Sequence, residues 1–169
     1  MKLFLLFLFL INLSFATEHR VLISGFSKHE HSHSSDGEKF NEENWGAGYE
    51  FTDFKEYGEL YFAGNFTVIK DSFSDAQFTL SASPNWRYKI YGDLDASIGV
   101  AAFLMWKKDT YKEGVSSDEA EYGLLPGIAP LASLYYKRFS VNLAYIPPLK
   151  IGSIDVTGVG IVYFGWKFN

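Results

Sequence analysis

The chain has 169 residues and a formal net charge of −5, and 47% of its residues are hydrophobic and 18% aromatic. The acidic balance argues against a nucleic-acid partner, which would demand a basic face. Cysteine is absent, so disulfide frameworks, thiolate nucleophiles and cysteine-ligated metals are excluded.

The first sixteen residues have the pattern of an export signal. Met1 and Lys2 give a basic start, an apolar run follows from Leu3 to Ile11, and Ser14-Phe15-Ala16 is a small-x-small cleavage site. The apolar run is shorter than the ~20 residues that a spanning helix needs. We therefore expect residues 1–16 to be a cleaved signal peptide and residues 17–169 to form one domain.

The rest of the chain divides into eight segments with strand-like alternation, separated by turn signals. In chain order they are residues 20–28, 45–51, 58–70, 77–86, 94–107, 124–136, 139–146 and 156–168. The last segment shows the pattern clearly, since Val162, Phe164 and Trp166 fall on one face at period two. No later segment offers about 18 consecutive apolar positions, which argues against a helical membrane protein.

Strands that turn apolar and aromatic groups outward and small or polar groups inward are typical of transmembrane β-barrels. We predict an all-β fold, an eight-stranded antiparallel transmembrane β-barrel of the outer membrane, formed by residues 17–169. With both termini in the periplasm, the loop at 29–43 and the break at 71–75 lie on the same outer side. Residues from these two places can therefore meet.

The interior of an eight-stranded barrel is filled by side chains or holds one small ligand, which disfavours a porin. Inward positions with small residues suit a hydrocarbon chain, and we expect these to include Ala63, Gly99, Ala101 and Ala132. Aromatic residues near strand ends predict an interfacial girdle made of Trp45, Trp106, Tyr135, Tyr136 and Trp166.

Several short motifs follow one another along the chain: Trp45-Gly46-Ala47-Gly48, Lys70-Asp71-Ser72, Trp86-Arg87, Pro130-Leu131-Ala132-Ser133 and Tyr145-Ile146-Pro147. In order and approximate spacing they resemble the PagP family of outer-membrane lipid A palmitoyltransferases. The resemblance implies an acyltransferase that moves an acyl chain from a glycerophospholipid donor to lipid A. Membrane lipids are then its partners, and we expect a monomer without a metal or other cofactor.

Family members need a His, an Asp and a Ser near the outer rim, and the intact Lys-Asp-Ser motif maps the last two to Asp71 and Ser72. His29 fits the spacing of the His, while His31 and His33 compete because an insertion in this loop would move the assignment. The implied roles are a general base for His29 and an orienting group for Asp71. Ser72 would be a nucleophile or an oxyanion donor.

Two other interpretations of these residues are open. Asp71 and Ser72 also suit a strand-ending turn, because both favour bonds from the side chain to the backbone. The alternation of His29, His31 and His33 permits a Zn²⁺ site, although Ser and Glu between them favour a solvated loop.

The chain departs from the family pattern at three places. Thr17 to Arg20 leave no room for the family's N-terminal amphipathic helix. Asn44 stands where the family has a proline before Trp-Gly, which leaves one of two gaps in the barrel ladder without its proline. In the acyl-chain pocket, Ser81 or Ser83 stands where the family has the glycine that sets acyl length.

Prolines at the ends of the sixth and seventh strands predict a lateral gate. A proline removes a backbone donor from the ladder, so Pro130 and Pro147 would open a gap through which lipid enters sideways. Plain strand termination is the alternative. For the whole protein, the alternatives to an acyltransferase are a non-catalytic lipid-binding or structural barrel, or a lipid hydrolase on the same scaffold.

Overall fold

The computed structural model describes residues 17–33, 37, 39–108, 121–151 and 154–168. The predicted signal peptide lies outside the described residues. Within these ranges no helix combines the length and apolar character needed to cross a bilayer. The strands are β1 (Glu18–His29), β2 (Gly46–Thr52), β3 (Leu60–Lys70), β4 (Ala76–Tyr91), β5 (Leu94–Lys108), β6 (Tyr122–Tyr136), β7 (Phe139–Ile146), β8 (Leu149–Ile151), β9 (Ile154–Val156) and β10 (Val159–Lys167).

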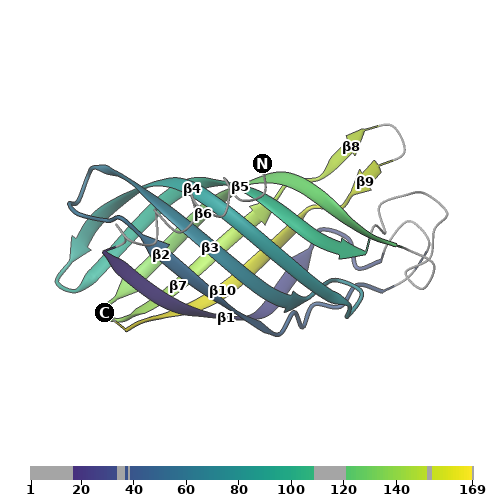
Figure 1. Ribbon diagram of the computed structural model, residues 1–169, viewed down its shortest axis with the longest axis horizontal. Coiled ribbons are helices and arrows are strands. Elements are labelled where there is room, and N and C mark those ends of the chain that lie inside the picture. The colour runs from purple at the N-terminus through teal and green to yellow at the C-terminus, as the bar shows by residue number, and fades with distance from the viewer. Residues whose placement is uncertain (1–16, 34–36, 38, 109–120, 152–153, 169) are drawn as a thin grey trace, which may run out of the picture.

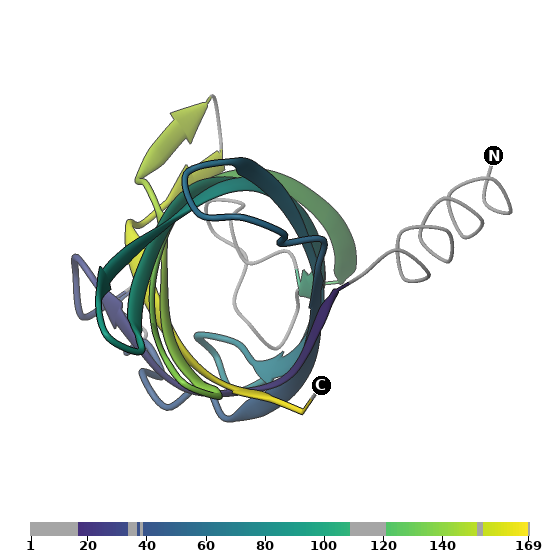
Figure 2. The same cartoon turned by 90° about the vertical axis from the view of Figure 1, so that its left-hand side faces the viewer.

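Eight of these strands close into one antiparallel barrel in the order β1-β10-β7-β6-β5-β4-β3-β2 (Figure 1). Seen nearly along its axis, the barrel is a ring of strands (Figure 2). The predicted eight-stranded antiparallel barrel is therefore confirmed. The short β8–β9 hairpin, which the sequence did not predict, lies in the connection between β7 and β10 and projects from the ring.

Apolar side chains cover the outside of the barrel because each strand alternates at period two. Along β5, Ile98 and Leu104 are exposed while Phe103 and Met105 are buried. On the next strand, β6, the apolar side chain of Ile128 is 64% exposed. A continuous apolar exterior of this kind requires a nonaqueous partner, and a bilayer suits a closed barrel.

Four of the five residues predicted for the aromatic girdle are exposed on the outside of the barrel, as that prediction requires, namely Trp45, Trp106, Tyr136 and Trp166. Tyr135 was predicted wrongly, because it is only 4% exposed and points into the barrel.

Strand β6 runs unbroken past both of its internal prolines. Pro126 pairs with Leu104 of β5, and Pro130 pairs with Val100. The predicted inward position of Ala132 is wrong, because Leu131 and Ser133 line the interior and their neighbour must face outward.

A network of buried charges fills the barrel at the end where the β4–β5 turn lies. Arg87 Nη1 lies 3.1 Å from Glu18 Oε2, and Arg87 Nη2 lies 3.0 Å from Asp95 Oδ2. The guanidinium carbon of Arg87 stands 4.0 Å from the centre of the Tyr135 ring. Buried charges are tolerated when they are paired and hydrogen-bonded, so these inward residues form the floor beneath the cavity described next.

Candidate functional site

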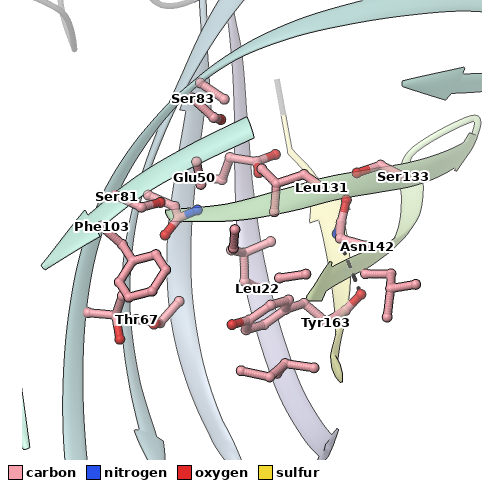
Figure 3. Close-up of a pocket in the computed structure, with 18 of the residues that line it drawn as sticks. Leu22, Glu50, Thr67, Ser81, Ser83, Phe103, Leu131, Ser133, Asn142 and Tyr163 are labelled. Atoms are coloured by element: carbon pink, nitrogen blue, oxygen red, sulfur yellow. Dashed lines mark hydrogen bonds between the residues drawn. The ribbon is translucent and has the colours of Figure 1, made fainter. Parts of the chain in front are cut away.

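Above this floor the barrel encloses a cavity to which all eight barrel strands contribute side chains (Figure 3). Tyr61 and Tyr135 lie at the floor, with their hydroxyl oxygens 3.3 Å apart. An apolar cluster of Phe103, Met105 and Ala129 lines the wall. The cavity thus has a polar floor and a wall in which this apolar cluster alternates with polar side chains such as Thr67, Gln77 and Asn142.

Both serines predicted for the acyl-chain pocket line this cavity (Figure 3). Ser83 is 2% exposed, and its hydroxyl accepts a 2.9 Å hydrogen bond from Asn85 Nδ2. Strand β4 begins beside the 71–75 turn and runs toward the floor. Ser83 therefore lies two residues deeper than Ser81.

At the other end of the barrel, the structure brings His29 and Ser72 together. His29 is the last residue of β1, and Ser72 follows β3. The distance between His29 Nε2 and Ser72 Oγ is 2.8 Å. His31 and His33 are exposed and do not share this position. The prediction that loops on the same side let these residues meet is confirmed for His29 and Ser72.

Packing by an aromatic side chain orients the imidazole. The Phe40 ring stacks on His29 with centroids 4.3 Å apart and planes at 19°, and Phe73 meets Phe40 edge-on at 5.6 Å. His29 is 6% exposed, and among the described residues its Nδ1 has no hydrogen-bond partner. Among the described residues, the hydrogen bond of the imidazole is therefore made by Nε2, the nitrogen that faces Ser72.

Asp71 shapes the turn that presents Ser72. Its Oδ1 accepts hydrogen bonds of 2.9 Å from the backbone N–H groups of Phe73 and Asp75. Its Oδ2 lies 3.1 Å from Lys107 Nζ. This differs from the expectation that Asp71 orients the imidazole. The observed contacts are those of a turn-forming aspartate whose charge is neutralised by a lysine.

A second, smaller cavity at the rim connects this site to the barrel interior. Asp71, Ser72 and Lys107 line it together with Ser27 and Asn44. Four further residues line both this cavity and the one below, namely Gln77, Met105, Ile146 and Ile161. Because the two cavities share these lining residues, an elongated ligand held in the barrel cavity would have one end beside Ser72.

The ladder between β6 and β7 stops short of the rim. Pairing runs from Tyr136↔Phe139 to Leu131↔Ala144. Beyond this point, Tyr122–Pro130 pair only with β5, and Tyr145 and Ile146 pair only with β10. Within the described residues, β6 and β7 therefore do not pair with each other from Pro130 to the rim. This is where the sequence predicts a lateral gate.

A second break separates β1 from β2. Their register ends at Ser24↔Gly46, and one backbone bond, from Ser27 N to Glu42 O at 2.9 Å, joins the segments beyond it. Asn44 donates from Nδ2 to the carbonyl of Lys70 at 2.9 Å. This break is therefore present although asparagine stands at the position of the family's proline.

An exposed ion pair lies in the loop beside His29. The Lys28 ammonium donates to both oxygens of Glu42, at 2.9 and 3.1 Å. These hydrogen bonds hold the pKa of Glu42 below its ordinary value. Among the described residues, no group of three or more His, Cys, Asp or Glu is arranged to hold a metal ion.

Sequence reasoning missed Lys107 and Phe40. The alternation of β5 offered a signal for Lys107, because Trp106 faces outward and its neighbour must face inward. Nothing in the sequence pattern predicted the stacking of Phe40 on His29, which depends on how the loop folds back.

Residues 12–167 match the family described as antimicrobial peptide resistance and lipid A acylation protein PagP. Over 131 residues the chain is 32% identical to a lipid A acyltransferase PagP of Methylobacillus flagellatus, covering 77% of this chain and 61% of the relative. Over 132 residues it is 30% identical to the protein of that name from Musicola paradisiaca, covering 76% and 59%. The chain thus spans about three fifths of the length of these relatives.

Two solved structures resemble the fold. Neisserial surface protein A aligns with a TM-score of 0.53 and 14% identity, covering 89% of this chain and 94% of the other. The N-terminal β-barrel domain of Pseudomonas aeruginosa OprF aligns with a TM-score of 0.50 and 9% identity, covering 90% and 98%. At such low identity the likeness concerns the barrel architecture alone.

Proposed function

Because this chain belongs to the PagP family of lipid A acylation proteins, we propose that it is an outer-membrane acyltransferase. It transfers an acyl chain, palmitoyl in the family pattern, from a glycerophospholipid to lipid A. It acts as a monomer and is exported by a cleaved signal peptide. The whole reaction takes place between lipids of the outer leaflet.

The observation that carries this proposal is the 2.8 Å contact between His29 Nε2 and Ser72 Oγ at the mouth of the barrel cavity. A base and a hydroxyl at hydrogen-bonding distance are the elements of acyl transfer. The apolar cluster of Phe103, Met105 and Ala129 in the wall below them offers a contact surface for a fatty acyl chain. A barrel that merely stabilises the membrane has no need for this pair beside a cavity.

In the proposed reaction the donor's acyl chain lies in the barrel, and its ester carbonyl reaches the rim cavity. His29 takes the proton from the lipid A hydroxyl as that oxygen attacks the carbonyl carbon. The bond to the glycerol oxygen then breaks, and the proton returns from His29 to that oxygen. In this direct route Ser72 donates to the oxyanion. In the covalent route Ser72 Oγ first attacks the carbonyl while His29 takes its proton and passes it to the leaving glycerol oxygen, and the lipid A hydroxyl then attacks the resulting ester and releases Ser72.

The donor enters through the unpaired span between β6 and β7. Backbone hydrogen bonds close the wall between neighbouring strands of a barrel, so a span without them is where an acyl chain can pass sideways. Pro130 lies where the pairing ends, and Pro147 directly follows β7. We propose these two residues as the edges of the gate and Ser81 and Ser83 as the determinants of acyl length.

The experiment is to mix the purified protein in detergent with phospholipid and lipid A and to analyse the lipids by mass spectrometry. The expected product is lipid A carrying one more acyl chain, together with the deacylated phospholipid. The variant S72A should lose roughly 100-fold or more of this turnover. Free fatty acid without acylated lipid A would indicate a hydrolase, and bound lipid without turnover would indicate a non-catalytic barrel.

A further inference from the structure

We propose that Lys107 is a positioning residue of this site. Its ammonium group holds the Asp71 carboxylate, and through the turn that Asp71 organises it keeps Ser72 at hydrogen-bonding distance from His29. The inference rests on the proposed function, because it adds a residue to the same site.

The ion pair between Lys107 and Asp71 is buried, and both residues line the rim cavity. Nζ lies 3.1 Å from Oδ2, and the side chains of Lys107 and Asp71 are 3% and 0% exposed. Lys107 belongs to β5, whereas Asp71 follows β3, and β4 lies between these strands in the barrel. The contact therefore ties the Ser72 turn to a strand that is not its neighbour.

Both ends of the turn depend on this contact. Asp71 Oδ1 holds the backbone N–H groups of Phe73 and Asp75, and Lys107 Nζ stands 5.8 Å from the centre of the Phe73 ring. Ser72 lies between Asp71 and Phe73, and its carbonyl accepts a 2.6 Å hydrogen bond from Asn41 N. A shift of the Asp71 carboxylate would thus move the residue that faces His29.

A buried carboxylate is costly without a compensating charge, and removing one partner of a buried pair leaves the other uncompensated. In the absence of Lys107, the Asp71 carboxylate is left buried without this partner and is driven toward water. Such a movement displaces the acceptor that organises the turn. Positioning errors of about 1 Å lower catalytic rates by about 100-fold.

The neighbouring lysine gives a matched control. Lys108 Nζ lies 3.0 Å from Asp75 Oδ2 in the same turn, but the two side chains are 21% and 27% exposed. Partly exposed pairs contribute little. We therefore compare K107M, K107R and K108M with the wild type, using the full chain in detergent.

We expect K107M to lower kcat by about 100-fold with little change in KM, K107R to restore most of the turnover, and K108M to stay within about twofold of the wild type. A second measurement does not depend on turnover. It is the unfolding temperature of K107M, D71N and the double variant, monitored by the gel mobility of the folded barrel. Destabilisation by K107M should be largely relieved when D71N removes the unpaired charge.

The outcomes separate this inference from the proposed function. An active wild type with an equally active K107M, or equal losses in K107M and K108M, overturns the role of Lys107. Additive stability effects of D71N and K107M overturn the ion pair on which that role rests. A folded wild type without transfer contradicts the proposed function itself, and the stability comparison then decides the ion pair alone.

Discussion

In the proposed reaction, replacing Ser81 or Ser83 of β4 by a longer residue should shorten the acyl chain that is transferred. Ser83 is buried at the lower part of the cavity, and Ser81 lines it two residues nearer the rim. A methionine side chain is two heavy atoms longer than serine, so S83M should displace about two methylene groups. At ~0.8 kcal/mol per methylene, the preference for the longest chain falls by ~1.6 kcal/mol, or about 15-fold.

The strand geometry predicts a larger effect for S81M. Two residues of strand span about 6.8 Å, and a tilt of about 40° reduces this to about 5 Å of depth. Carbon–carbon bonds of about 1.5 Å in a zigzag advance about 1.3 Å per methylene. S81M should therefore shorten the favoured chain by about four methylenes more than S83M.

The assay offers the protein a mixture of phospholipids with different saturated chains and determines the mass of the acylated lipid A. The matched control is A82M, because Ala82 lies between the two serines and its side chain faces outward. The favoured length should fall in the order wild type, S83M, S81M, with A82M unchanged. Equal product masses in all four proteins, or a shift in A82M, would refute the reasoning.

Two further predictions concern the gate and the floor. Because the chain has no native cysteine, the gate can be tested with cysteines placed at Pro130 and Tyr145. Oxidation to a disulfide should slow transfer until a reductant is added. Crosslinking without any loss of transfer would argue against the gate. The control is a cysteine pair where β6 and β7 already pair, at Leu134↔Val141. At the floor, R87M removes a partner from the buried carboxylates of Glu18 and Asp95. The free energy of unfolding, measured by urea titration, should fall by about 3–5 kcal/mol. An unchanged midpoint would show that the network contributes no stability.

Much of the barrel could be predicted because its strands follow a local rule. Side chains alternate between the two faces at every residue, so Phe164 and Trp166 pointed outward before any pairing was known. The end of β4 at Tyr91 and the passage of β6 through Pro130 could not be predicted in this way. Strand ends depend on the partner strand, and the pairing of β6 with β5 overrides the local signal of the proline.

The candidate site was likewise predicted only in part from the sequence. Counting chain crossings placed His29 and Ser72 on one side of the barrel, and the sequence pattern alone carried this prediction. The choice of His29 over His31 rests on the fold, because only the end of β1 brings an imidazole to within 2.8 Å of Ser72.

By itself, the sequence determined the alternation, the number of barrel strands and the side of the barrel on which the loops at 29–43 and 71–75 lie, since these follow from neighbouring residues along the chain. Only the tertiary structure decided which charges meet inside. Lys107 and Asp71 lie 36 positions apart with a strand between them, and their contact exists because closure of the sheet turns distant inward side chains toward one another.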